Sequence, residues 1–348
     1  EADGFTYPYK IGLIVGSLFY LLIGLIFLSK FLLRYFEDHI VSTALTILYL
    51  GTNLFDFETA NPTFSHSYSF ALIALFLYST VKWIDQPKIK WALWMGVSGG
   101  LMFLIRPIDI IFLSFIPLFN IRSLQDFKDR FALLWNYKGH VLLFAGFFIL
   151  MILPQLLYYK YIFGSFVYYS YSDEGFFFLS PHLFDSVFSY RNGWLVYSPI
   201  MIFSVLGLFF VRRYSKEFQW FSPFAFLIYF YVIASWWCWW YAGFGNRAFI
   251  NLYSILAIPL AVFFQFVFSK GIVLRSVLKL VVLAGIVLSV FQTYQFHRGA
   301  IHWSDMTKTA YWDSFLRASP SQLFNTYLEP VVIERQQQGE NWVFSSKV

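Results

Sequence analysis

Charged residues are scarce in this sequence. Asp, Glu, Lys and Arg make up 13% of 348 residues, against about a quarter in ordinary soluble domains. Hydrophobic residues make up 59% and aromatic residues 24%. So few charges could not cover that much apolar surface in water. The composition excludes a disordered chain, a coiled coil and a nucleic-acid-binding module for most of the length, and predicts an all-α, polytopic membrane helix bundle.

Cysteine is nearly absent as well. The single Cys238 excludes an intrachain disulfide and any metal site built from several cysteines. The sequence also begins at Glu1, without a methionine, a signal peptide or a leading apolar segment. This start predicts that an upstream part was removed or is missing from the sequence.

Apolar stretches of the length that crosses a bilayer, about 20 residues, recur along the chain. We expect ten spans, of which the fourth and fifth are short and could instead form one helix kinked at Pro107. The expected spans are 9–29, 39–55, 67–83, 91–105, 107–120, 140–160, 193–211, 220–238, 248–268 and 274–295. The spacings Gly12–Gly16 and Gly96–Gly100 are typical of faces where two membrane helices pack closely.

The lysines and arginines favour ten crossings over nine. They cluster in alternate loops, near 30–34, 82–90, 122–138, 212–216 and 270–279, and the positive-inside rule places these loops in the cytoplasm. The clusters at 82–90 and 122–138 share a side only if 91–120 crosses twice, with Arg106-Pro107 at the outer tip of a hairpin. We therefore expect a transmembrane domain over 1–296 and a folded extracytoplasmic tail over 297–348.

Outside the expected tail, three arginines fall on the opposite, outer side: Arg106, Arg191 and Arg247. Arginine keeps its charge at membrane depth and binds phosphate with two parallel hydrogen bonds. We interpret the three as candidates for an anionic ligand, such as a lipid phosphate. The alternative is that each pairs with a nearby carboxylate, for which the candidates are Asp109, Asp173 and Asp185.

The outer loop 56–66 carries the densest group of polar residues at this rim. Asn61 is expected to cap a helix that starts at Pro62, with Ser65 and His66 in or near its first turn. Asp56 and Glu58 could act as a base, as ligands of a divalent metal or as salt-bridge partners. A histidine at such a rim is more often structural, but two carboxylates in the same loop favour a site.

Aromatic residues gather in 235–247, where four tryptophans and a tyrosine precede Asn246 and Arg247. The pattern is typical of an aromatic belt at a membrane surface. The alternative is a surface that stacks on sugars or isoprenoid chains, formed by Trp239, Trp240 and Tyr241. The segment 189–194 repeats the combination with Arg191 and Asn192.

These pieces, in their order, resemble the GT-C superfamily of integral-membrane glycosyltransferases. The nearest resemblance is to bacterial relatives of the protein O-mannosyltransferases and of the lipid A aminoarabinose transferase. The matching pieces are Asp3-Gly4-Phe5 with Pro8-Tyr9, Gly51-Thr52-Asn53 with Ser65-His66 and Ser69-Phe70, Arg106-Pro107, Arg191-Asn192-Gly193 with Ser198-Pro199, Trp239-Trp240 with Gly245-Asn246-Arg247, and Gly299-Ala300-Ile301-His302-Trp303 with Tyr311-Trp312.

The resemblance implies transfer of a sugar from a polyprenyl phosphate, on the outer face of the cytoplasmic membrane, with inversion at the anomeric carbon. The outer arginines would stabilise the leaving lipid phosphate. The family's catalytic aspartate belongs to a first outer loop that has no counterpart here, and Asp3 lies only at its downstream edge. Within this chain Asp56, Glu58 and His66 are the remaining candidates for binding the acceptor or a metal.

Two other functions fit the composition. A transporter or lipid flippase would usually show ionisable residues at mid-membrane or an inverted repeat, and neither is evident. A non-catalytic subunit of a larger membrane assembly, with protein partners, remains the second alternative.

Overall fold

The computed structural model describes residues 4, 6–171 and 174–330. Asp3, Asp173 and residues 331–348 of the expected tail lie outside the described residues. Every regular element within the described ranges is a helix, and one isolated antiparallel bridge joins Phe176 to Trp236. The chain is therefore an all-helical protein, as its composition predicts.

Six helical segments are long and apolar enough to cross a membrane: α1 (Tyr7–Leu32), α4 (His66–Asp85), α8 (Lys138–Phe163), η3–α13 (Lys216–Ala234), η4–α14 (Arg247–Phe268) and α15 (Ile272–His297). Four shorter apolar segments overlap the other expected spans: α2 (Asp38–Leu50), α5 (Ile89–Ile105), η1–α6 (Pro107–Leu118) and η2–α11 (Pro199–Leu208). The remaining helices are α3 (Leu54–Thr59), α7 (Leu124–Asn136), α9 (Asp185–Phe188), α10 (Trp194–Tyr197), α12 (Val211–Tyr214), α16 (Lys308–Ser314) and η5 (Phe324–Tyr327).

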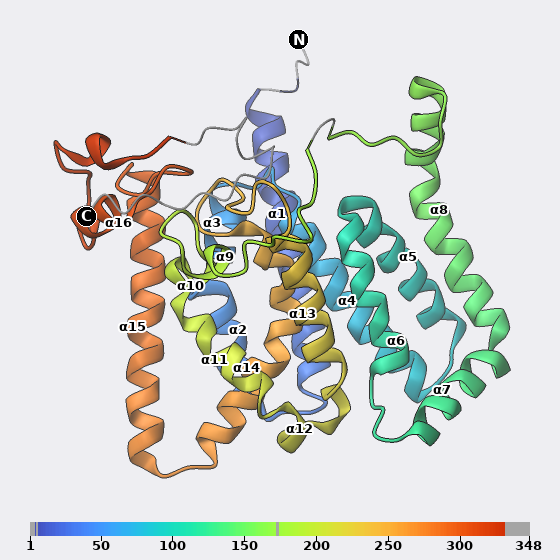
Figure 1. Ribbon diagram of the computed structural model, residues 1–348. Helices are drawn as coiled ribbons and strands as arrows, with labels where there is room; N and C mark the ends of the chain where they lie inside the picture. The colour runs from blue at the N-terminus through green and yellow to red at the C-terminus, as the bar shows by residue number, and fades with distance from the viewer. Residues whose placement is uncertain (1–3, 5, 172–173, 331–348) are drawn as a thin grey trace.

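Helix α14 lies at the centre of the bundle, where it packs against α2, α4, α11 and α13. Its closest approach is to α11: a Cβ atom on Gly207 would lie 1.9 Å from the carbonyl oxygen of Pro259. Figure 1 shows α8 and α15 at the two edges of this bundle. Both edge helices keep most of their surface outside the protein core, as lipid-facing helices do.

Gly96 and Gly100 of α5 form a face that packs closely on α8, as predicted. Cβ atoms on Gly96 and Gly100 would lie 2.6 Å from the carbonyl oxygens of Phe144 and Phe148 on α8. The same prediction for α1 is wrong, because no described atom lies within 4 Å of a Cβ on Gly12. At Gly16 a Cβ would lie 3.7 Å from Tyr68 Oη on α4, which is an ordinary contact and not a close approach of two backbones.

The predicted hairpin over 91–120 is present. Helix α5 ends at Ile105, Arg106 is extended with φ −145° and ψ 108°, and Pro107 opens η1. The return segment packs back on α5, where a Cβ on Gly99 would lie 3.3 Å from Leu113 Cδ2. Proline disfavours a helical conformation in the residue before it, so Arg106-Pro107 reverses the chain.

The loops that carry the positive clusters all lie at one end of the bundle, the lower end in Figure 1. Polar contacts tie this end together: Arg34 pairs with Asp85, and Arg122 Nη2 lies 2.7 Å from Glu217 Oε1. The opposite end carries α3, α9, loop 235–246 and residues 298–330. The loops that carry the positive clusters and the outer arginines Arg106, Arg191 and Arg247 thus lie at opposite ends of the bundle.

Residues 298–330 form a folded cap on that opposite end. Ile301, Met306, Tyr311 and Phe324 pack with Tyr197 and Phe244 in a second buried cluster. The aromatic residues of this segment therefore make a small core of their own against the bundle.

Candidate functional site

In the polar loop 56–66, the following helix starts at a different residue from the one expected. Helix α4 begins at His66 with Ser65 as its N-cap, so the expected helix start at Pro62 is wrong. The Asn61 side chain does not cap this helix, because its Nδ2 donates to Asp56 Oδ2 at 2.9 Å. His66 nevertheless occupies the first turn of α4, as expected.

His66 is fully buried and touches Arg106 across the tip of the α5–η1 hairpin. An Nη2 of Arg106 lies 3.0 Å from His66 Nε2, and Arg106 Nε lies 3.4 Å from Ser65 Oγ. Because a guanidinium only donates hydrogen bonds, His66 Nε2 must accept. The histidine therefore meets Arg106 as a neutral ring.

A buried amide fixes this arrangement from the other side. Asn251 Nδ2 donates to both carboxylate oxygens of Asp109, each at 3.0 Å, which turns Asn251 Oδ1 toward His66 Nδ1, also at 3.0 Å. Tyr229 Oη donates to Asp109 Oδ1 at 3.1 Å. Since Asn251 Oδ1 can only accept, His66 carries its proton on Nδ1 and presents a lone pair at Nε2.

The consequence is that Arg106 is held by neutral acceptors. No carboxylate of the described residues forms an ion pair with Arg106 or with Arg247. Asp109, one of the carboxylates considered for this role, instead takes its hydrogen bonds from Asn251 and Tyr229. Asp109 is near enough to interact electrostatically with Arg106, but no described carboxylate lies within ion-pair distance of the hairpin tip.

Arg247 lies beside this tip, at the start of η4 and α14. Its guanidinium carbon lies 4.8 Å from the centre of the Phe64 ring, and Nη1 donates to the Ala242 carbonyl oxygen at 2.5 Å. Its buried Nε has no hydrogen-bond partner among the described residues. Arg106 and Arg247 are close enough for their charges to repel. Two arginines held together without a carboxylate are an arrangement that attracts an anion.

Two neighbouring candidates position these groups. Asn246 Oδ1 accepts from the backbone N–H of Ala248 at 3.2 Å, so it caps η4 and sets the place of Arg247. Tyr241 adopts φ +40°, its Oη donates to the Ile233 carbonyl oxygen at 3.3 Å, and it is near enough to Arg106 to feel its charge. Tyr241 is half-buried and forms part of the wall around the arginines.

Three of the four tryptophans of loop 235–246 are buried, and Trp236 is half-buried. Trp239 and Trp240 are 2% and 3% exposed, and they pack edge to face with ring centres 5.9 Å apart. His182 stacks on Trp239, with ring centres 5.7 Å apart. Protein therefore covers the ring faces that a sugar would need, and the loop serves as a rigid support for Arg247.

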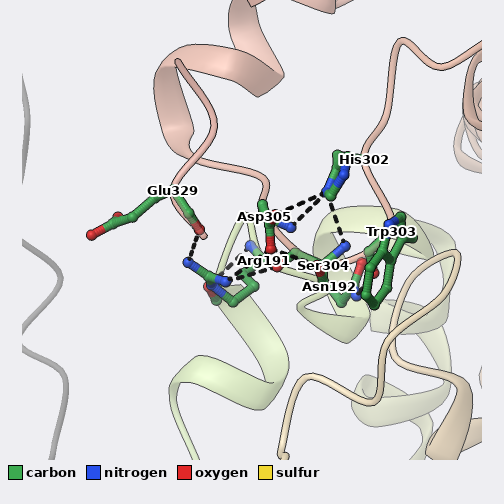
Figure 2. Close-up of polar contacts among 8 residues, drawn as sticks. Arg191, Asn192, His302, Trp303, Ser304, Asp305 and Glu329 are labelled. Atoms are coloured by element: carbon green, nitrogen blue, oxygen red, sulfur yellow. Dashed lines mark hydrogen bonds and ion pairs between the residues drawn. The ribbon is translucent and has the colours of Figure 1, made fainter. Parts of the chain in front are cut away.

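Arg191 has a different environment from the other two arginines (Figure 2). Its guanidinium donates to the carbonyl oxygens of Ser304 and Glu329 at 2.8 and 2.7 Å, and it lies 3.7 Å from Asp305 Oδ1. The neighbouring Asn192 donates from Nδ2 to the Trp303 carbonyl oxygen at 2.8 Å. Burial lowers the pKa of Arg191, and the nearby carboxylates of Asp305 and Glu329 oppose this shift.

The two carboxylates of α3 are buried and separate. Asp56 Oδ1 lies 2.6 Å from His297 Nε2 at the end of α15. Glu58 Oε2 accepts from Ser17 Oγ at 2.8 Å, while Glu58 Oε1 has no hydrogen-bond partner in the described part of the chain. Burial raises the pKa of both, that of Glu58 to about 7.

No group of three or more His, Cys, Asp or Glu side chains in the described ranges is placed to hold a metal ion. The divalent metal left open by the sequence therefore has no assembled protein site there. Burial also raises the pKa of the Cys238 thiol to about 11, which makes it a poor nucleophile.

Comparison with models of known protein families, with curated proteins and with solved structures found no match for this chain. The site must therefore be interpreted from its own geometry.

Sequence reasoning missed Asn251 and the role of His297. Asn251 lies inside an apolar stretch, 185 positions from His66, and only the folded bundle brings the two together. The sequence did contain one indication of this role: Asn251 is a polar amide within an expected span, and a polar group at that depth needs a partner within the protein.

Proposed function

We propose that the chain is a membrane glycosyltransferase of the GT-C type, which transfers a sugar from a polyprenyl phosphate to an acceptor hydroxyl. One observation carries this proposal: Arg106 and Arg247 lie together at one end of the bundle, and no described carboxylate forms an ion pair with either. Because Ser65 and His66, which hold Arg106, are neutral, the charge of Arg106 can still interact with an anionic ligand. A phosphate ester that leaves during transfer needs this kind of stabilisation.

In the proposed reaction the acceptor oxygen attacks the anomeric carbon while the bond from that carbon to the phosphate oxygen breaks. The leaving phosphate gains negative charge, which Arg106 and Arg247 stabilise. His66 is not free to take the acceptor proton, because its Nε2 lone pair already accepts from Arg106.

A histidine oriented by Asp56 suits the proton transfer better. His297 Nε2 contacts the buried Asp56 carboxylate, and 41% of the His297 side chain remains exposed. Its Nδ1 would receive the acceptor proton, and Asp56 would stabilise the resulting imidazolium. In this proposal Asp56 acts through His297.

The proposal includes the orientation of the bundle. We propose ten crossings, in which the four shorter segments also span, and a site that faces away from the cytoplasm on the inner membrane. In a Cys238→Ser background, alkylation of Ala60→Cys from outside and of Asp126→Cys only from inside would support it. The reverse pattern would overturn the orientation.

The phosphate clamp is tested by native mass spectrometry of the purified protein with polyprenyl monophosphate. Arg106→Gln and Arg247→Gln should each weaken binding about tenfold or more. Arg298→Gln is the matched control, because this exposed arginine lies at the same end of the bundle. Equal binding by all three variants and the unaltered chain would refute the clamp.

The chemical step is tested by the release of polyprenyl phosphate from polyprenyl-phosphate-linked pentoses and hexoses in membranes. His297→Gln should slow this release without changing the affinity for polyprenyl monophosphate. No release from any donor, with the clamp intact, would instead favour a non-catalytic subunit that binds the lipid.

A further inference from the structure

A groove lies at the other end of the bundle, between α2, α14 and α15. It consists of two adjoining cavities of about 290 and 610 Å³, which share Thr43, Phe268, Arg275 and Lys279 in their walls. Helix α15 packs only lightly on the bundle, so the groove lies along its inner side. This groove is remote from the candidate site, since α15 runs between the two ends (Figure 1).

One wall of the groove is positive. Arg275 and Lys279 are one turn apart on α15, and no carboxylate of the described chain forms an ion pair with either. Arg275 Nε donates to the Lys270 carbonyl oxygen at 2.7 Å, which orients the guanidinium. Glu37 also lines the larger cavity, but its carboxylate lies 3.4 Å from His39 Nδ1 and is 79% exposed.

The facing wall supplies hydroxyl groups and an unused acceptor. Ser42, Thr43 and Thr46 line the groove from α2. Gln265 of α14 lines the larger cavity, and its buried Oε1 has no hydrogen-bond donor in the described chain. A buried acceptor without a donor is costly, so a ligand with a hydroxyl group would gain by supplying one.

The deeper part of the groove is apolar. Phe264, Val267, Leu278 and Val282 line the smaller cavity beside the polar groups. A ligand that fits both parts has an anionic, hydroxyl-bearing head and a hydrocarbon chain.

We propose that this groove binds one anionic phospholipid of the surrounding leaflet, with a hydroxylated head group such as phosphoglycerol. Arg275 and Lys279 bind the phosphate, Gln265 Oε1 accepts from a head-group hydroxyl, and an acyl chain lies along Leu278 and Val282. Basic pockets between helices bind anionic head groups in this manner. The inference does not depend on the proposed transferase activity.

Native mass spectrometry of the purified chain tests the site with phosphatidylglycerol and phosphatidylcholine of identical acyl chains. We expect one phosphatidylglycerol to be retained in preference to phosphatidylcholine. Arg275→Gln combined with Lys279→Gln should weaken that binding about tenfold or more. The control combines Arg212→Gln with Arg213→Gln, which removes two exposed charges at the same end and should leave the binding unchanged.

A second variant keeps the experiment decisive if the double substitution fails to fold. Thr46→Trp places a bulky ring in the groove without changing its charge, and it should displace the phospholipid. Equal retention of the two lipids, equal loss in the control, or displacement of phosphatidylglycerol by an equimolar amount of polyprenyl monophosphate would overturn the proposal.

Discussion

The neutral imidazole of His66 accepts a hydrogen bond from Arg106 over 3.0 Å, and Asn251 sets its protonation from the opposite side. The chain of contacts ends at the buried carboxylate of Asp109. A positive group at the tip of the hairpin is thereby oriented without being neutralised.

Asn251→Leu should destabilise the protein and weaken binding of polyprenyl monophosphate. The change leaves Asp109 and His66 buried without their shared partner, which costs about 2–4 kcal/mol. Thermal unfolding in detergent and native mass spectrometry measure the two effects.

Ser254→Ala is the control for this substitution. Ser254 lies on the same helix, and its Oγ donates only to the Phe70 carbonyl oxygen at 3.0 Å. Its loss should cost about 1 kcal/mol and leave phosphate binding unchanged. If the two variants weakened phosphate binding equally, Asn251 would have no positioning role.

Glu58→Gln should alter how stability depends on pH. Burial raises the pKa of Glu58 from 4.5 to about 7, so the native protein binds the proton more tightly than the unfolded chain. Stability should therefore fall as pH rises from about 4.5 to 7, by about 3 kcal/mol at most. The glutamine variant should lose this fall and be more stable than the unaltered chain above pH 7.

The measurement is the unfolding midpoint of both proteins between pH 5 and 8 in one detergent. Because other groups titrate in this range, the difference between the two curves is the relevant quantity. A difference that stays flat across the range would contradict the assignment to Glu58.

Arg191→Gln should loosen the cap formed by residues 298–330. The substitution removes the charge that contacts Asp305 and the donors to Ser304 and Glu329, and breaking such a buried contact costs about 3–5 kcal/mol. Hydrogen exchange of residues 301–329 should accelerate strongly. Arg298→Gln, in which the altered arginine is exposed, should leave that exchange unchanged.

Gly96→Leu should separate α5 from α8, because even a Cβ there would lie 2.6 Å from the backbone of α8. We expect a loss of at least about 2–3 kcal/mol from overpacking. Gly12→Leu provides the comparison, since nothing described lies within 4 Å of its Cβ. Similar thermal stability of the two variants would show that α5 and α8 adjust their distance freely.

Sequence alone predicted the helix class, the hairpin at Arg106 and the close packing at Gly96, because composition, charge placement and residue size act locally or along single helices. It failed where partners are distant in the chain. Asn61 was expected to cap a helix, but Asp56 takes its amide. Arg191 was grouped with Arg106 and Arg247, whereas the fold places it against the cap. Long-range hydrogen bonds decide these positions, and no local pattern encodes them.

The contact between α5 and α8 has a consequence for how α8 is attached to the bundle. Lipid tails are as apolar as leucine, so burial from water does not drive two membrane helices together. Helix α8 has no fully buried residue, and its contact at Gly96 and Gly100 depends on close fit. The attachment of α8 to the bundle therefore depends on this close fit and not on burial from water.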